Sequence, residues 1–145
     1  MQISQDLDVF SYTIRAYDTD SVSINLPISP EQLAQSRVDP TVEAPKLKQE
    51  RLDKSFIISA KYLARDWPIK SINDLSEINI EAFAEQRPEL VIIGTGKRAE
   101  WPPISLFKPL INQGIGFEIM DTAAACRTYN ILNFEDRHVI AGLIL

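Results

Sequence analysis

The sequence is poor in the two residue types that most often bind metals and perform nucleophilic chemistry. It contains one cysteine, Cys126, and one histidine, His138. A single cysteine cannot form an internal disulfide, and no second cysteine or cluster of histidines is available to build a zinc site. We therefore expect no metal site and no cofactor, and the cysteine content fits a reducing cytoplasm.

Long hydrophobic runs are also missing. The apolar residues, 45% of the chain, occur in short runs, whereas a membrane-spanning helix needs about 20 consecutive apolar positions. Residues 1–8 have neither a basic stretch nor a long apolar run, and their acidic residues argue against a secretory signal and an organelle presequence. We expect a cytoplasmic protein that does not itself span a membrane.

The chain has no excess of positive charge. Its net charge is −5, and the isoelectric point is near 4.9. Nucleic-acid-binding proteins usually present a basic surface that replaces counterions on the phosphate backbone. We therefore do not expect nucleic acid as a partner.

The size of the chain, 145 residues and 16.4 kDa, predicts one domain with one hydrophobic core. In the first part, residues 9–26 alternate between apolar and polar side chains around the turn-forming segment Asp18-Thr19-Asp20. This pattern predicts an antiparallel β-hairpin. Residues 27–54 contain four prolines and no sustained period. They predict a mobile surface excursion, with a brief helix that starts at Ser29 and Pro30.

From residue 55 onward the pattern is that of an α/β domain. Short apolar runs predict strands at 55–59, 90–93, 115–120 and 139–145, and helical spacing predicts helices at 80–86, 103–112 and from 121 or 122 to about 133. Within the second of these helices we expect Ile104, Phe107, Leu110 and Ile111 to face inward. Strands that alternate with helices predict a central mixed sheet with helices packed on it.

Gly94-Thr95-Gly96 follows the buried-type strand at 90–93 and matches the start of a dinucleotide-binding motif. In such a motif the turn opens directly into a helix, whereas here Trp101-Pro102-Pro103 delays the helix. Glycines at such a turn commonly provide a positive φ or a close backbone approach, without any ligand. The amide groups of the turn, together with Lys97 and Arg98, could instead form a nest for an anion.

The candidate catalytic residues are few. A reactive cysteine needs a neighbouring base, and His138 lies in a different predicted element from Cys126. Cys126 is more simply a small buried side chain, and His138 is structural or exposed at an edge. Spacing also singles out no pair of acidic residues for acid–base catalysis. We predict no catalytic residue and leave an enzymatic role open as the less favoured alternative.

Two turns lie at carboxyl ends of strands, Gly94–Gly96 and the segment around Thr122. In open α/β sheets, ligands bind beyond these ends. The polar run Arg127–Asn130 on the last helix must point around more than one face, so it serves either a structural polar network or a shallow pocket. The tentative ligand or anion-binding residues are therefore Gly94, Thr95, Gly96, Arg98, Thr122, Arg127 and Asn130.

Two aromatic side chains are tentative contacts for a partner protein, Trp101 and Tyr129. Tryptophan is enriched among interface residues that contribute strongly to binding. Trp101 and Trp67 both precede a proline in a predicted loop. For both tryptophans, packing at the margin of the core is the default alternative.

The strongest signal is the order of motifs in residues 89–145: a strand ending in GTG, a proline-bearing loop, the segment GIGFEIM, and then DTAAACRTYN and a closing hydrophobic strand. This order resembles the Mth938-like family, small single-domain proteins of unknown function that include the mitochondrial complex I assembly factor 3. The resemblance is close over about 57 residues and covers the first half only in outline. It implies a three-layer fold with a mainly parallel sheet of about five strands.

The resemblance also implies a function, which we keep as an expectation. Its first form is a non-catalytic binding or assembly module that helps to build a membrane-bound respiratory complex. Its alternative is a small-ligand binder or enzyme that uses the pocket near Gly94–Gly96 and Arg127–Asn130. The motif is specific for the family but not for a reaction, because the same fold can carry different functions.

Overall fold

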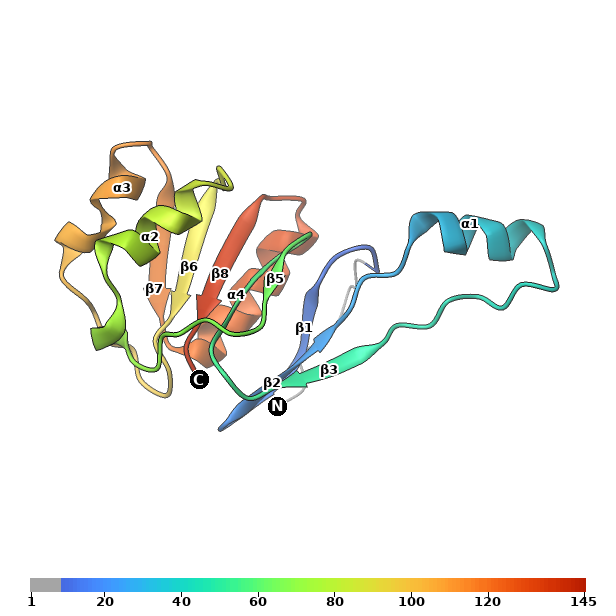
Figure 1. Ribbon diagram of the computed structural model, residues 1–145, viewed down its shortest axis with the longest axis horizontal. Coiled ribbons are helices and arrows are strands. Elements are labelled where there is room, and N and C mark those ends of the chain that lie inside the picture. The colour runs from blue at the N-terminus through green and yellow to red at the C-terminus, as the bar shows by residue number, and fades with distance from the viewer. Residues whose placement is uncertain (1–8) are drawn as a thin grey trace.

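The computed structural model describes residues 9–145, so the prediction made for residues 1–8 lies outside the described residues. The chain forms two β-sheets (Figure 1). The first is antiparallel with the order β1-β2-β3, built from β1 (Thr13–Asp18), β2 (Ser21–Asn25) and β3 (Gln49–Leu52). The predicted hairpin is confirmed, with its turn at residues 19 and 20.

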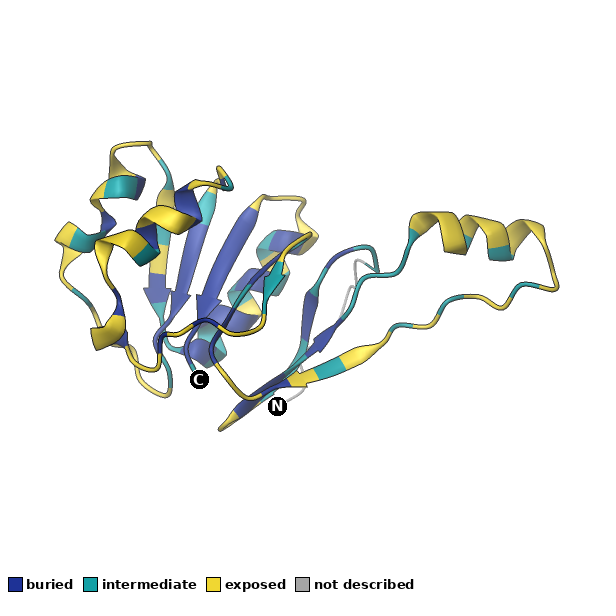
Figure 2. Cartoon of the chain, viewed as in Figure 1, coloured by how far each residue is buried: buried dark blue, intermediate teal, exposed yellow. Residues whose placement is uncertain are grey.

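The segment after β2 leaves the body of the protein. It carries α1 (Pro30–Val38), which has no buried residue and whose first turn is capped by the Ser29 hydroxyl, as predicted. Figures 1 and 2 show α1 at the far end of an exposed arm. The predicted excursion was too long, however, because residues 49–52 return as β3 and pair with β2.

The second sheet has five strands in the order β5-β4-β8-β6-β7. Its strands are β4 (Phe56–Ser59), β5 (Leu63–Ala64), β6 (Leu90–Gly94), β7 (Gly116–Met120) and β8 (Val139–Leu143). The strands β7, β6 and β8 are mutually parallel, whereas β4 pairs antiparallel with both β8 and β5. The predicted mixed α/β sheet is confirmed, although β5 had no recognisable signal in the sequence.

The helical elements are η1 (Ile72–Asp74), α2 (Glu77–Ala84), η2 (Ile104–Phe107), α3 (Lys108–Ile111) and α4 (Thr122–Phe134). The predicted helix 103–112 is therefore not continuous. A new helix starts at Lys108, where Pro109 occupies one of its first positions and lacks the N–H that a helix interior requires. Phe107 and Leu110 are buried as predicted, but Ile104 and Ile111 are exposed.

The central sheet is covered by apolar side chains on both faces. Val91 and Ile93 of β6 pack with residues of α2, η2 and α3, whereas Ile92 between them packs with residues of α4, β1 and β2. This alternation explains why the β6 sequence is continuously apolar: successive side chains point to opposite faces, and both faces are buried. The sheet therefore positions α4 and the three-stranded sheet on the same side.

Trp67 belongs to the core, so packing rather than partner contact is confirmed for this tryptophan. Trp67 is 7% exposed, and its ring meets the Phe83 ring edge-on, with the ring centroids 5.8 Å apart. Gly142 of β8 lies beneath both rings. A Cβ atom at this position would lie 2.7 Å from the Trp67 ring and 2.8 Å from the Phe83 ring.

We expect Gly142→Ala to lower the free energy of unfolding by about 1–3 kcal/mol, because overpacking forces buried side chains from their preferred positions. Urea denaturation followed by circular dichroism measures the change. Gly116→Ala is the matched control, since its Cβ would meet a Leu90 side-chain atom at 3.3 Å and the Glu89 carbonyl oxygen at 3.6 Å, both longer than the contacts at Gly142. Equal stability of the two variants would contradict the packing described for Trp67.

Candidate functional site

The turn after β6 is held tightly by backbone hydrogen bonds to neighbouring strand ends. The Thr95 N–H donates to the Met120 carbonyl at the end of β7 (2.8 Å), and the Ile144 N–H donates to the Gly94 carbonyl (3.0 Å). Gly96 has φ = +100°, a conformation that glycine adopts without strain. The turn therefore joins the ends of β6, β7 and β8.

Thr122, the first residue of α4, locks this junction. Its hydroxyl accepts a hydrogen bond from the Gly96 N–H (2.8 Å) and donates one to the Ile144 carbonyl (2.7 Å), while its own N–H donates to the Gly96 carbonyl (2.9 Å). Gly94 permits this approach, because a Cβ there would lie 3.0 Å from the Thr122 Cα. The polar groups of the GTG turn and of Thr122 thus satisfy one another.

These bonds limit what the turn can offer to a ligand. The N–H groups of Thr95 and Gly96 already donate within the protein, so an anion nest cannot use these two groups in this conformation. The Thr95 hydroxyl donates to the Arg98 carbonyl and accepts from the Glu100 N–H, which shapes the following loop. The side chains of Lys97 and Arg98 remain exposed.

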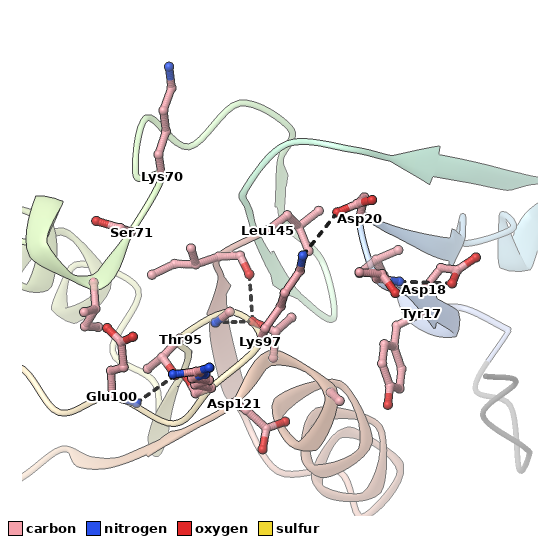
Figure 3. Close-up of a pocket in the computed structure, with 18 residues that line it drawn as sticks. Tyr17, Asp18, Asp20, Lys70, Ser71, Thr95, Lys97, Glu100, Asp121 and Leu145 are labelled. Atoms are coloured by element: carbon pink, nitrogen blue, oxygen red, sulfur yellow. Dashed lines mark hydrogen bonds and ion pairs between the residues drawn. The ribbon is translucent and has the colours of Figure 1, made fainter.

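A cavity of about 900 Å³ lies at this end of the sheet, between the GTG turn and the tip of the β1–β2 hairpin (Figure 3). Lys97 reaches across toward Asp20 of the hairpin tip, with the charged atoms 3.9 Å apart. The charged residues of the lining are Asp18, Asp20, Lys70, Lys97, Arg98, Glu100 and Asp121. Three cationic and four acidic side chains give the cavity no excess of positive charge, and this favours a neutral or zwitterionic occupant over a simple anion.

The structure brings together only some of the residues predicted to bind a ligand. Thr95, Gly96, Arg98 and Thr122 line the cavity. The side chains contributed by the hairpin tip and by Lys70 were not predicted. The sequence identified the hairpin turn, but nothing in it indicated that the turn faces the GTG loop. Gly94, Arg127 and Asn130 do not line this cavity.

The placement of Asn130 in the pocket was wrong, because its side chain is bonded to the three-stranded sheet. The Ile14 N–H donates to Asn130 Oδ1 (2.9 Å), and Asn130 Nδ2 donates to the Ile14 carbonyl (2.7 Å). Arg127 points to solvent instead of into the pocket. The polar run on α4 is therefore divided between a structural bond and an exposed cation.

The structure also corrects the assignment of Tyr129 as a partner contact. Its side chain is fully buried, and its hydroxyl donates to the Tyr12 carbonyl (2.8 Å). Its position on the buried face of α4 leaves no surface for a partner. Trp101, by contrast, is 71% exposed, and the neighbouring Ile104 is 63% exposed, so the prediction for Trp101 stays open.

Cys126 is fully buried among apolar residues of α4, β1 and β8, which confirms it as a small core side chain. Burial raises the pKa of its thiol to about 12. His138 is exposed, as predicted. Among residues 9–145 no group of three or more histidine, cysteine and acidic side chains is arranged to hold a metal ion, and no helix there has the length and apolar character needed to cross a membrane.

The fold and the sequence of the chain place it in a protein family. Residues 43–144 match the family described as protein of unknown function (DUF498/DUF598), and the chain belongs to that family. The hairpin and α1 precede the matched region. A Bordetella pertussis protein described as a Mth938-like domain has the same fold, with a TM-score of 0.69 and 22% identity over 99% of this chain and 92% of its own.

Two further proteins are similar to this one. The NADH dehydrogenase (ubiquinone) 1 alpha subcomplex assembly factor 3 of Bos taurus is 36% identical over 80 residues, which cover 54% of this chain and 44% of that protein. The chain thus matches less than half of that relative's length. A Bordetella parapertussis protein of known structure has a TM-score of 0.72 and 26% identity, covering 95% of this chain and 98% of its own.

We expect Thr122→Val to lower the free energy of unfolding by about 1–3 kcal/mol, because the part-buried Gly96 N–H and the buried Ile144 carbonyl lose their hydroxyl partner. Thr122→Ser keeps the hydroxyl and is the matched control. Chemical denaturation of both variants measures the difference. A valine variant as stable as the serine variant would show that the hydroxyl does not lock the junction.

Cys126 should be inert in the folded protein. Because its pKa is raised from 9.0 to about 12, the neutral thiol is favoured in the folded state, and this contribution to stability is constant below about pH 9. The contribution is lost as the pH rises from about 9 toward 12. We therefore expect an aromatic disulfide reagent at pH 8 to modify Cys126 only at the rate of unfolding. Rapid modification of the native protein would contradict its burial.

Proposed function

We propose that this protein is a non-catalytic binding module that assists the assembly of a membrane-bound respiratory complex, in association with another protein. The similarity to an assembly factor supports the proposal most directly. The matched segment is about half of this chain and less than half of that relative, so the role is carried over as a hypothesis. We also propose a cytoplasmic location, and the net charge of −5 disfavours nucleic acid as a partner.

The hydrogen bonds of the DTAAACRTYN segment agree with a binding role. Thr122, Tyr129 and Asn130 use their polar atoms on the protein's own backbone, so these side chains contribute to the fold instead of to a reaction. The loop after the GTG turn is different, because it exposes Trp101 and Ile104 around two prolines. Prolines restrict the backbone, so these apolar side chains are presented at little entropic cost.

A pull-down of the tagged protein from its own cells tests the assembly role. We expect Trp101→Ala to reduce recovery of respiratory-complex subunits at least about tenfold, as expected for an interface tryptophan that contributes strongly to binding. Ile78→Ala is the matched control, because Ile78 is 77% exposed on α2. Both variants should unfold at the temperature of the unmodified protein.

Two results of the pull-down would count against the assembly proposal. If no respiratory subunit is recovered with the unmodified protein, the assembly role fails. If Trp101→Ala and Ile78→Ala recover the same amount of respiratory subunits, the contact does not depend specifically on Trp101.

The alternative is a ligand binder or enzyme that uses the cavity at the strand ends. The volume of the cavity and the mixed charges of its lining support this alternative. Native mass spectrometry of protein purified from its own cells distinguishes the two roles. A bound small molecule that is lost on Arg98→Ala, but kept on Arg127→Ala, would favour the alternative. Under the assembly proposal we expect the purified protein to carry no such molecule.

A further inference from the structure

The strand β7 forms an open edge of the five-stranded sheet. It is last in the strand order and pairs in parallel with β6 at all five of its positions, without a bulge. Within residues 9–145 no strand pairs with its other side. Figure 1 shows β7 at the side of the sheet that is farthest from β4 and β5.

The hydrogen bonds to β6 show which backbone groups of β7 face outward. The Gly116 N–H donates to the Glu89 carbonyl (3.3 Å), and the Met120 carbonyl accepts from the Thr95 N–H (2.8 Å). In a parallel ladder alternate residues bond to the same neighbouring strand, so the backbone groups of residues 116, 118 and 120 face β6. The N–H and C=O groups of Phe117 and Ile119 therefore point away from the sheet, where an added strand would find them.

The other strand edges in the described part of the chain carry features that discourage strand addition. β5 has only two residues. β1 contains a bulge, and the backbone N–H and C=O of Ile14 are hydrogen-bonded to the Asn130 side chain. β3 carries Glu50 and Arg51, and Glu50 is paired with Arg65. Short length, bulges and charges are the usual protection of an edge. β7, with the sequence GFEIM, carries one charge, Glu118, and has neither a bulge nor a lysine nor a proline.

Apolar side chains flank the β7 edge on both faces of the sheet. On one face the Phe117 ring stacks on Phe107 of η2, with centroids 4.4 Å apart, and Ile111 of the following α3 is 52% exposed. On the other face the Thr128 hydroxyl contacts the Met120 sulfur (3.4 Å). Ile131, three residues further on α4 and therefore on the same side of that helix, is 60% exposed.

The charge of Glu118 distinguishes between two occupants of the β7 edge, a second copy of this chain and a segment of a different protein. Glu118 is exposed at the centre of β7. If a second copy of this chain paired antiparallel with full overlap, each Glu118 would lie opposite the same residue of the other copy. Like charges that face each other across two strands destabilise the pair. A basic residue in this position of the added strand would instead be attracted.

We propose that the β7 edge binds an extended, apolar-rich segment of a partner protein by strand addition, with a basic residue of that segment opposite Glu118. The inference rests on the proposed binding role and names a second surface for it, in addition to the loop at Trp101. Main-chain hydrogen bonds to Phe117 and Ile119 supply affinity, and the flanking side chains supply selectivity, as in other cases of strand addition.

Synthetic nine-residue peptides of alternating valine and threonine, with either lysine or glutamate at the centre, serve as probes. We expect the unmodified protein to bind the lysine peptide about fivefold more tightly, and Glu118→Lys to reverse this preference. Glu81→Lys makes the same change of charge on the exposed side of α2 and should keep the original preference. In hydrogen exchange, the Phe117 and Ile119 amides should become protected when the lysine peptide binds.

Three results would overturn the proposal: no peptide binding, equal binding of both peptides, or binding that leaves the Phe117 and Ile119 amides unprotected. Light scattering that detects a dimer with these amides protected in the absence of peptide would assign the edge to a second copy instead. The pull-down separates this inference from the assembly role. If Glu118→Lys still recovers the respiratory subunits that the unmodified protein recovers, the edge proposal fails while the assembly role stands.

Discussion

The pair of hydrogen bonds between the Asn130 side chain and the Ile14 backbone is the interaction on which the arrangement of the two sheets depends. Through it, α4, which packs on the five-stranded sheet, also continues the hydrogen bonding of the edge strand β1. Tyr129, one position earlier, adds a hydrogen bond to the Tyr12 carbonyl. Because buried backbone groups without partners are costly, these side chains hold the three-stranded sheet in one register against the helix.

The same helix is fixed at its other end by Thr122, so the polar residues of DTAAACRTYN serve the fold more than they serve a ligand. Thr122 joins three strand ends, Asp121 caps the helix, and Cys126 fills the core. A conspicuous polar motif of this kind is easily taken for an active site. Here the groups that remain available are elsewhere, on the loop at Trp101 and along the edge of β7.

The sequence predicted most elements whose signal is local. The apolar run of β6, the Asp121 cap of α4 and the hairpin turn all depend on neighbouring residues. β3 was missed because its four residues, QERL, include one apolar side chain, and its strand character comes from pairing with β2. The role of Asn130 was equally hidden, since its partner lies 116 residues away. The GTG turn and Thr122 were expected to meet, but the opposing hairpin tip was not.

The central claim is that α4 makes the two sheets one cooperative unit and that, within residues 9–145, the arm with α1 stands apart from it. Native-state hydrogen exchange with residue resolution tests it directly, because amides that open together share one free energy of opening. We expect the same opening free energy for Ile24 of β2 and Ile92 of β6, and rapid exchange throughout α1. An opening of β1 and β2 at a much lower free energy than β6 and β8 would show that the sheets are independent, and would contradict the account.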